Sequence, residues 1–252
     1  MKKSFVTLLL VLCTISALAV DIPKQGFGLQ IGWAQPIVRL NSPTSKDTLA
    51  NTVKLKGFKV GVVYDASYIA GFGSSIGLNY TFGAQSSGWQ SENPGHNVYP
   101  KSRTFITYHQ LELYVDWQYK FEVAKETYLM LYTGPSIQCG LALTMRQDRQ
   151  TEDWITGDIT TKYGDRYNAY DVLAFDEGKD PKHLRDDNAL KRINVTWGVG
   201  AGFQYKRYYL RGGYDFGLIN PYKYSDFANG NHARGRIDQW NIKLGVYLWY
   251  AE

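Results

Sequence analysis

A period-two alternation of apolar and polar side chains runs through most of this 252-residue chain. Near the C-terminus, for example, Trp240, Ile242 and Leu244 alternate with Asn241 and Lys243. Because successive side chains of a β-strand point to opposite faces of its sheet, each such segment predicts a strand with one apolar and one polar face. Eight segments show the pattern: Phe27–Trp33, Gly57–Tyr64, Phe72–Phe82, Phe105–Phe121, Tyr128–Leu143, Asn194–Tyr205, Tyr208–Gly217 and Gln239–Tyr250.

The composition suits strands and excludes a helical membrane protein. Aromatic residues make up 15% of the chain and glycine occupies 25 positions, a mixture typical of strands and turns. Beyond the first twenty residues, no apolar run approaches the roughly 20 residues that a membrane helix needs. We therefore expect an all-β protein.

The N-terminus has the features of an export signal. Two lysines at positions 2 and 3 precede an apolar stretch, and Ala17-Leu18-Ala19 offers a small-x-small cleavage site. We expect residues 1–19 to be cleaved as a signal peptide and residues 20–252 to form one barrel domain.

The mature chain would carry a small positive charge and a single cysteine. Cleavage removes two of the 28 basic residues, which leaves 26 − 23 = +3 without any basic block, so no nucleic-acid partner is expected. Cys139 is then the only cysteine, so an internal disulfide is impossible.

A water-soluble β-sandwich or a lipocalin-like barrel would show the same alternation, but two features favour a membrane barrel. The polar faces are rich in Gly, Ser and Asn, which fit the narrow lumen of an eight-stranded barrel. Aromatic residues gather at both ends of the apolar faces, as bilayer interfaces select. One ring would contain Trp33, Phe58, Phe82, Phe105, Trp197, Phe216 and Trp240, and the other Phe27, Tyr64, Phe72, Tyr119, Tyr205, Tyr208 and Tyr250.

The connections between the segments alternate in length. Those after the second, fourth and sixth segments are short: 65–70, 122–127 and the residues around Arg207. The others are long: 35–54, 84–103, 146–192 and 219–237. Short periplasmic turns and long extracellular loops predict an all-β transmembrane antiparallel up-and-down β-barrel of eight strands in the bacterial outer membrane, with both termini periplasmic.

Three stretches carry a family resemblance. "YHQLELYVDWQYKF", "YLMLYTGPSIQCG" and "WGVGAGFQYKRYYLRGGYDFGLINPY" look like successive strands of the PorT-like outer-membrane β-barrel family, which is related in architecture to OmpA and OmpX. The resemblance covers essentially the whole mature chain and implies eight strands and residence in the outer membrane. Such barrels usually end on an aromatic residue, whereas here Ala251 and Glu252 follow Tyr250.

Charged residues of both signs occupy the polar faces. Because charges inside a membrane protein are unfavourable unless paired or wetted, we expect a paired network that closes the lumen, with a small aqueous channel as the alternative. We expect Lys59 and Lys243 near Glu112 at mid-height, and Arg211 lower, near Asp116 and Asp215. The full predicted network is Lys59, Glu112, Asp116, Lys120, Lys206, Arg211, Asp215 and Lys243.

The longest connection, 146–192, is rich in charges of both signs. The residues around 155–163 and 167–175 could pair as a hairpin above the membrane, or add two strands to give ten. A short surface helix is expected after Asp180-Pro181, with Asp as its N-cap.

No catalytic, cofactor or metal site is predicted. Of the four histidines, His96, His183 and His232 lie in predicted loops and His109 lies on the lipid-facing register, where an interfacial role is the simplest reading. No nucleophile and carboxylate constellation accompanies them. We expect a non-enzymatic barrel whose loops serve surface interaction or envelope integrity, with outer-membrane lipid and an extracellular ligand or envelope protein as partners. A narrow passive pore and a lipid-modifying enzyme are the alternatives.

Overall fold

The computed structural model describes residues 25–41, 53–69, 71–92, 99–153, 155–170, 190–221 and 234–251, so the predicted signal peptide lies outside the described residues. Within these ranges the regular structure is antiparallel β-sheet, and no helix is long and apolar enough to cross a membrane. The strands are β1 (Gln25–Asn41), β2 (Val53–Lys54), β3 (Gly57–Ile69), β4 (Phe72–Ser86), β5 (Gln90–Ser91), β6 (Lys101–Ala124), β7 (Thr127–Glu152), β8 (Ile159–Lys162), β9 (Tyr167–Asn168), β10 (Ile193–Tyr205), β11 (Tyr208–Gly217) and β12 (Arg234–Ala251).

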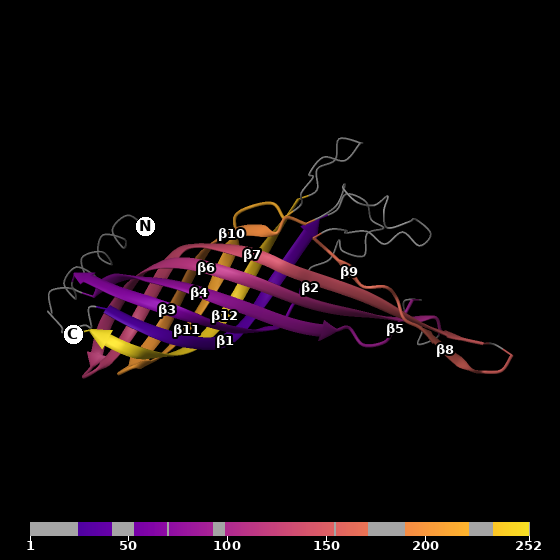
Figure 1. Cartoon of the computed structure of the whole chain (residues 1–252), viewed down its shortest axis with the longest axis horizontal. Coiled ribbons are helices and arrows are strands. Elements are labelled where there is room, and N and C mark those ends of the chain that lie inside the picture. The colour runs from indigo at the N-terminus through magenta and orange to yellow at the C-terminus, as the bar shows by residue number, and fades with distance from the viewer. Residues whose placement is uncertain are drawn as a thin grey trace, which may run out of the picture.

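Eight of these strands close into a barrel (Figure 1). Their order is β6-β4-β3-β1-β12-β11-β10-β7, and pairing of β7 with β6 completes the circle. Neighbours along the chain pair as up-and-down hairpins, and β1 pairs with β12, so Gln25 lies opposite Ala251. The predicted eight-stranded antiparallel barrel is confirmed, and the ten-stranded alternative is wrong.

The outer surface of the barrel is an apolar belt. Ile31, Leu113 and Leu244 are each about half exposed, and the same holds for most outward-facing residues of the eight strands. A belt of this size would be unfavourable in water, whereas hydrocarbon requires it. Because the closed barrel leaves no unpaired edge around its wall, the fold is that of a protein that crosses a bilayer with its strands.

Aromatic residues lie toward both ends of the belt. Trp33, Phe58 and Phe82 stand side by side on β1, β3 and β4 at the end where the long connections lie, which we call the loop end. At the opposite turn end, Phe27 pairs with Tyr64. Also exposed at one end or the other are Trp197, Phe216, Trp240, Phe72, Tyr205 and Tyr208.

Three residues of the predicted aromatic rings are not found as exposed ring members. Phe105 is wrongly placed, because β6 continues past the ring and Phe105 pairs with Arg146 beyond it. Tyr119 is only half-buried at the turn end, and the side chain of Tyr250 lies outside the described residues. A register shift after Phe27 also exposes Trp249 on the outside, which simple alternation did not predict.

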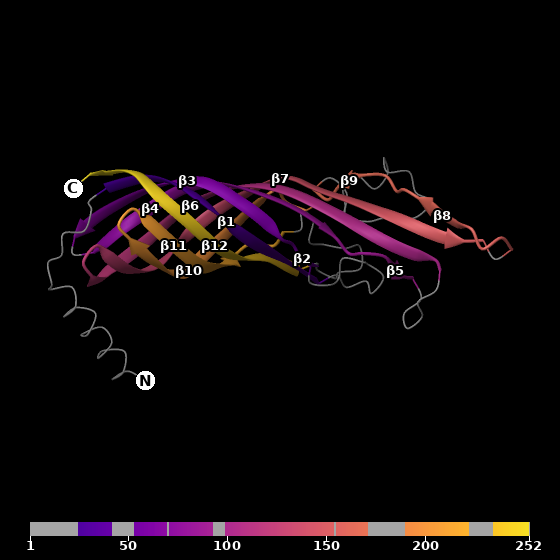
Figure 2. The ribbon, with the colours of Figure 1, turned by 90° about the horizontal axis from the view of Figure 1, so that it is seen from below.

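At the loop end, strands β6 and β7 extend further than predicted. β6 has 24 residues and β7 has 26, whereas about 9–11 tilted residues cross a bilayer. Figures 1 and 2 show their outer ends projecting from the barrel. The prediction that the long connection begins at residue 146 is therefore wrong. β7 continues to Glu152, and both Ile159–Lys162 and Tyr167–Asn168 pair with β7. The predicted helix after Asp180 lies outside the described residues.

Candidate functional site

A buried ion cluster fills the half of the lumen nearer the turn end. The Asp65 carboxylate lies 3.1 Å from Arg211 Nη2 and 3.2 Å from Lys120 Nζ. Arg211 also donates to Ser75 Oγ at 2.9 Å and to Gln118 Oε1 at 2.7 Å. These five side chains, the Asp65 cluster, come from β3, β4, β6 and β11 and are all buried, so they tie opposite walls of the barrel together.

A second cluster lies around Glu112. Lys59 Nζ is 2.9 Å from the Glu112 carboxylate, which also accepts hydrogen bonds from Asn79 at 2.7 Å, Gln239 at 3.0 Å and Gln138 at 3.3 Å. This arrangement, the Glu112 cluster, satisfies the buried carboxylate from four strands. Charge-assisted hydrogen bonds of this kind are the strong ones in a low-dielectric interior.

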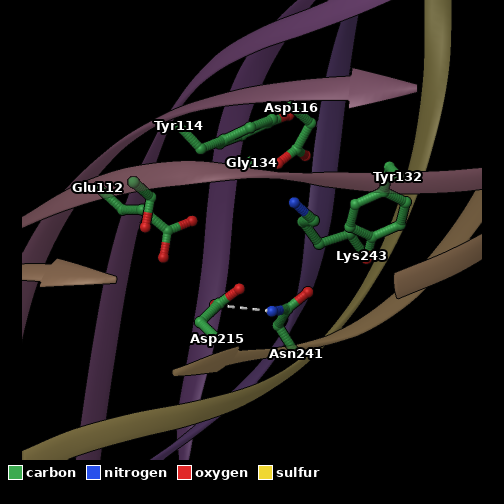
Figure 3. Close-up of a pocket in the computed structure, with 9 residues that line it drawn as sticks. Glu112, Tyr114, Asp116, Tyr132, Gly134, Asp215, Asn241 and Lys243 are labelled. Carbon is green, nitrogen blue, oxygen red and sulfur yellow. Dashed lines mark hydrogen bonds between the residues drawn. The ribbon is translucent and has the colours of Figure 1, made fainter. Parts of the chain in front are cut away.

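A small cavity lies beside Glu112 in the lumen, and Figure 3 shows its lining. Asn241 donates to the Asp215 carboxylate at 2.9 Å, and the Lys243 ammonium lies 4.1 Å from the centroid of the Tyr114 ring. Asp116 faces the same space and is buried. The cavity has room for about one water molecule and not for a solute.

Glycines make space for the tyrosines that fill the lumen between the charges. A Cβ at Gly77 would lie 2.4 Å from the Tyr114 ring, and one at Gly200 would lie 2.3 Å from the Tyr132 ring. Neither ring could stay in place if its glycine carried a side chain. The small residues of the polar faces therefore accommodate large residues on neighbouring strands, and the interior is packed.

The described lumen charges balance. Four are basic and four acidic: Lys59, Lys120, Arg211, Lys243, Asp65, Glu112, Asp116 and Asp215. A packed and electrically balanced interior favours a closed barrel over a water-filled channel.

Two features of the predicted charge network are corrected. Lys206 does not face the lumen: it lies exposed in the turn between β10 and β11 with a φ of 51°, 3.8 Å from Glu126. Arg211, expected near Asp116 and Asp215, forms its ion pair with another residue. Its partner is Asp65, a residue that the sequence assigned to a turn, whereas β3 runs on to Ile69 and turns Asp65 inward.

An apolar cluster covers the lumen at the loop end. We call it the apolar cap, and its buried members are Val38, Leu55, Ile106, Tyr108, Leu143, Met145, Ala169 and Leu190. Tyr170 packs against it, and burial raises the pKa of the Tyr170 hydroxyl to about 12. Part of the connection after β7 therefore folds back onto the barrel mouth, which the sequence did not reveal.

The outer ends of β6 and β7 form a small sheet with β5 and β8, which we call the projecting sheet. At its base the fully buried Asp148 lies 3.2 Å from Arg103 and 3.0 Å from Arg146. Both guanidiniums stack on the Phe105 ring, at 4.3 and 4.7 Å from its centroid. Buried ionic and stacking contacts thus stiffen the sheet where it leaves the barrel.

His109 lies on the outside of β6 beside Phe82. The Tyr80 hydroxyl lies 2.5 Å from His109 Nδ1, and the Phe82 and His109 rings are 5.1 Å apart. These are contacts of an aromatic residue at the edge of the apolar belt. Within the described ranges, no group of three or more histidine, cysteine, aspartate or glutamate side chains is arranged to hold a metal ion.

Comparison with known proteins finds similarity only among solved structures. No protein-family model matches the chain, and no curated protein sequence matches it. Ail, the attachment invasion locus protein of Yersinia pestis, crystallised with the heparin analogue sucrose octasulfate, is 10% identical, and the match covers 89% of this chain and 99% of Ail with a TM-score of 0.37. Neisserial surface protein A is 13% identical over 88% of this chain and 97% of its own, with a TM-score of 0.34. At this level of similarity, none of their properties is transferred to this chain.

Proposed function

We propose that this protein is a non-enzymatic barrel of the bacterial outer membrane that presents the projecting sheet as an interaction surface. In this proposal residues 1–19 direct export, residues 20–252 form the PorT-like barrel, and both termini face the periplasm. The barrel then serves as a rigid anchor in the membrane, and the loop end faces the outside of the cell.

The projecting sheet is the observation that carries the proposal. It extends well beyond the membrane-crossing part of the barrel, and its tip exposes apolar side chains: Ile155 is 94% exposed and Ile159 is 53% exposed. Within the described residues β8 pairs only with β7, and none of those residues adds a strand to its other edge. Exposed apolar residues next to an open strand edge are the features by which proteins recruit an added strand or a partner surface.

The interior gives less support to the two alternatives. A passive pore needs a continuous wet path, whereas the lumen holds two paired ion clusters below an apolar cap. A lipid-modifying enzyme needs a base beside a nucleophile, whereas His109 contacts Tyr80 and Phe82. An extracellular ligand or envelope protein that meets the projecting sheet is the partner we propose, besides the surrounding outer-membrane lipid.

To test the proposal, the full-length protein is expressed on the surface of cells that lack it. Adherence of these cells is then measured to immobilised matrix proteins, to a sulfated polysaccharide and to a lawn of the same cells. We expect adherence to at least one surface, and its loss in the double variant Ile155→Ser/Ile159→Ser. The variant Thr160→Ser is the matched control on the same strand and should adhere as the wild type does.

The proposal fails if no surface is bound, or if the double variant adheres as well as the wild type. Equal surface display of all three proteins, measured with an antibody against whole cells, is the condition for reading either result.

A further inference from the structure

Two arginines stand directly opposite each other on the outer face of the barrel near the loop end. Arg39 on β1 and Arg236 on β12 are cross-strand partners, and the side chain of each is 46% exposed. Both pair with the same aspartate: Asp238 lies 2.9 Å from Arg236 Nε and 3.4 Å from Arg39 Nε. We call these three residues the arginine pair site.

Asp238 orients the two arginines and neutralises only one of them. It is fully buried and accepts a hydrogen bond from the Gly217 amide at 3.0 Å, so its position is fixed by the backbone of β11. Like charges directly opposite in a sheet repel, and one carboxylate leaves a net charge of +1. Each guanidinium has five N–H donors, so most donors of the pair remain available to a further acceptor.

The depth of this site matches the headgroup region of a bilayer. Asp238 is two residues beyond Trp240 on β12, about 7 Å along the strand and about 5 Å along the axis of a tilted barrel. Trp240 packs with Tyr214 at 4.7 Å, and Tyr214 packs with Phe216 at 4.7 Å. Aromatic clusters of this kind lie at the headgroup level, so the guanidiniums lie where lipid phosphates are found.

The site around Asp148 contains the same residue types, but there the arginines are engaged by contacts within the protein. Asp148 also lies between two arginines, but Arg103 and Arg146 are only 26% exposed and both stack on Phe105. For the side chains of Arg39 and Arg236, no stacking on a ring is found among the described residues. At 46% exposure, the side chains of Arg39 and Arg236 are more accessible than those of Arg103 and Arg146.

We infer that the arginine pair site binds the phosphate group of an outer-leaflet lipid headgroup. The inference rests on the proposed outer-membrane location. Two planar guanidiniums held side by side can each bind a phosphate through paired N–H donors, and the carboxylate between them holds that geometry before the ligand arrives. The lipid would stand beside the barrel with its acyl chains along the belt below Trp240.

The test uses native mass spectrometry of the purified full-length barrel in detergent. Dioleoyl phosphatidic acid is titrated against dioleoylglycerol, which has the same chains and no phosphate. We expect the wild type to retain phosphatidic acid preferentially, and Arg39→Gln/Arg236→Gln to weaken that retention by about tenfold or more. Arg39→Lys/Arg236→Lys keeps the charge but loses the planar guanidinium. Its retention of phosphatidic acid should therefore lie between those of the wild type and the glutamine variant.

The control variant removes the same charge from the other end of the barrel. Lys125→Gln/Lys206→Gln alters two exposed lysines in the turn-end connections and should bind phosphatidic acid as the wild type does. Heat-modifiable gel migration shows whether each variant is folded, and the single change Arg236→Gln replaces the double variant if that does not fold.

Three outcomes would overturn the inference. They are absence of a preference for phosphatidic acid in the wild type, equal loss in the control variant, and displacement of the lipid by inorganic phosphate at similar concentration. The last would identify a free phosphate as the ligand. Because adherence is not measured here, lipid retention with failed adherence would reject only the proposed function.

Discussion

Asp65 is the buried residue on which most of the turn-end half of the lumen depends. Its carboxylate faces both Arg211 and Lys120, so Asp65→Ala would leave two buried cations without their partner. Removing one member of a buried ion pair destabilises by about 3–5 kcal/mol, whereas an exposed pair contributes at most about 1 kcal/mol. We therefore expect Asp65→Ala to lower the free energy of unfolding by the larger amount. Glu126→Gln should lower it by the smaller amount, because its partner Lys206 is exposed. Equilibrium urea unfolding in lipid bilayers measures both, and equal losses would contradict the assigned network.

Leu113 tests the lipid-facing register at the same scale. It lies on the outer face of β6, half exposed, opposite Leu78 and Ile137 on the neighbouring strands. An arginine near the bilayer midplane costs about 2–4 kcal/mol, and one near an interface about 0–1 kcal/mol. Leu113→Arg should show the larger loss and Tyr208→Arg, at the turn end, the smaller one in the same unfolding assay. A reversed order would mean that the belt is misplaced.

The sequence predicted which charged side chains face the lumen more reliably than it predicted which of them form ion pairs. Alternation places both Glu112 on β6 and Lys59 on β3 in the lumen, where they meet across the intervening strand β4. The partner of Arg211 was not predicted, because Asp65 sits 146 positions away, near the end of a strand whose final residues, Ser67 to Ile69, have no apolar alternation. Pairing across a lumen depends on barrel tilt and strand stagger, which no single strand encodes.

At the scale of elements, the eight strands were predictable because lipid on one side and a packed lumen on the other impose a strict alternation. The projecting sheet was not. Beyond His109, β6 and β7 leave the bilayer, both faces meet water or protein, and charges such as Arg146 and Asp148 replace the apolar face. A rule based on apolar alternation therefore ends the strands where the membrane ends. The apolar cap was missed for the same reason, since Ala169 and Leu190 belong to no alternating segment.

The connection after β7 has two parts with different roles, and deletions should separate them. Replacing residues 151–160 with a two-residue glycine turn removes only the tip of the projecting sheet, so unfolding free energy and heat-modifiable migration should stay close to those of the wild type. Deleting 151–187 also removes Ala169 and Tyr170 from the apolar cap. Loss of buried apolar packing of this size should destabilise by about 2–5 kcal/mol. Equal stability of the two deletions would show that the cap does not depend on this connection.

Seen as a whole, the molecule has a closed, balanced interior and an elaborated loop end. Two ion clusters and several tyrosines fill the lumen, and an apolar cluster lies over it. The lumen is thus closed at two levels, by paired charges inside the barrel and by apolar packing above them. This closure argues against transport of solutes through the barrel. The surface features that could meet a partner, namely the projecting sheet and the arginine pair site, both belong to the loop end.

Single-channel recording in planar bilayers tests this closure directly. The wild-type barrel should show little or no steady conductance, because the Glu112 cluster and the apolar cap leave no continuous water path. Glu112→Ala leaves Lys59 buried without its carboxylate, so it should destabilise the barrel by about 3–5 kcal/mol or admit water and raise the conductance. Replacing both partners, as in Lys59→Met/Glu112→Leu, removes the unpaired charge while keeping the volume, and should restore stability and silence together. A large, stable wild-type conductance that Glu112→Ala leaves unchanged would contradict the closed lumen and favour the pore.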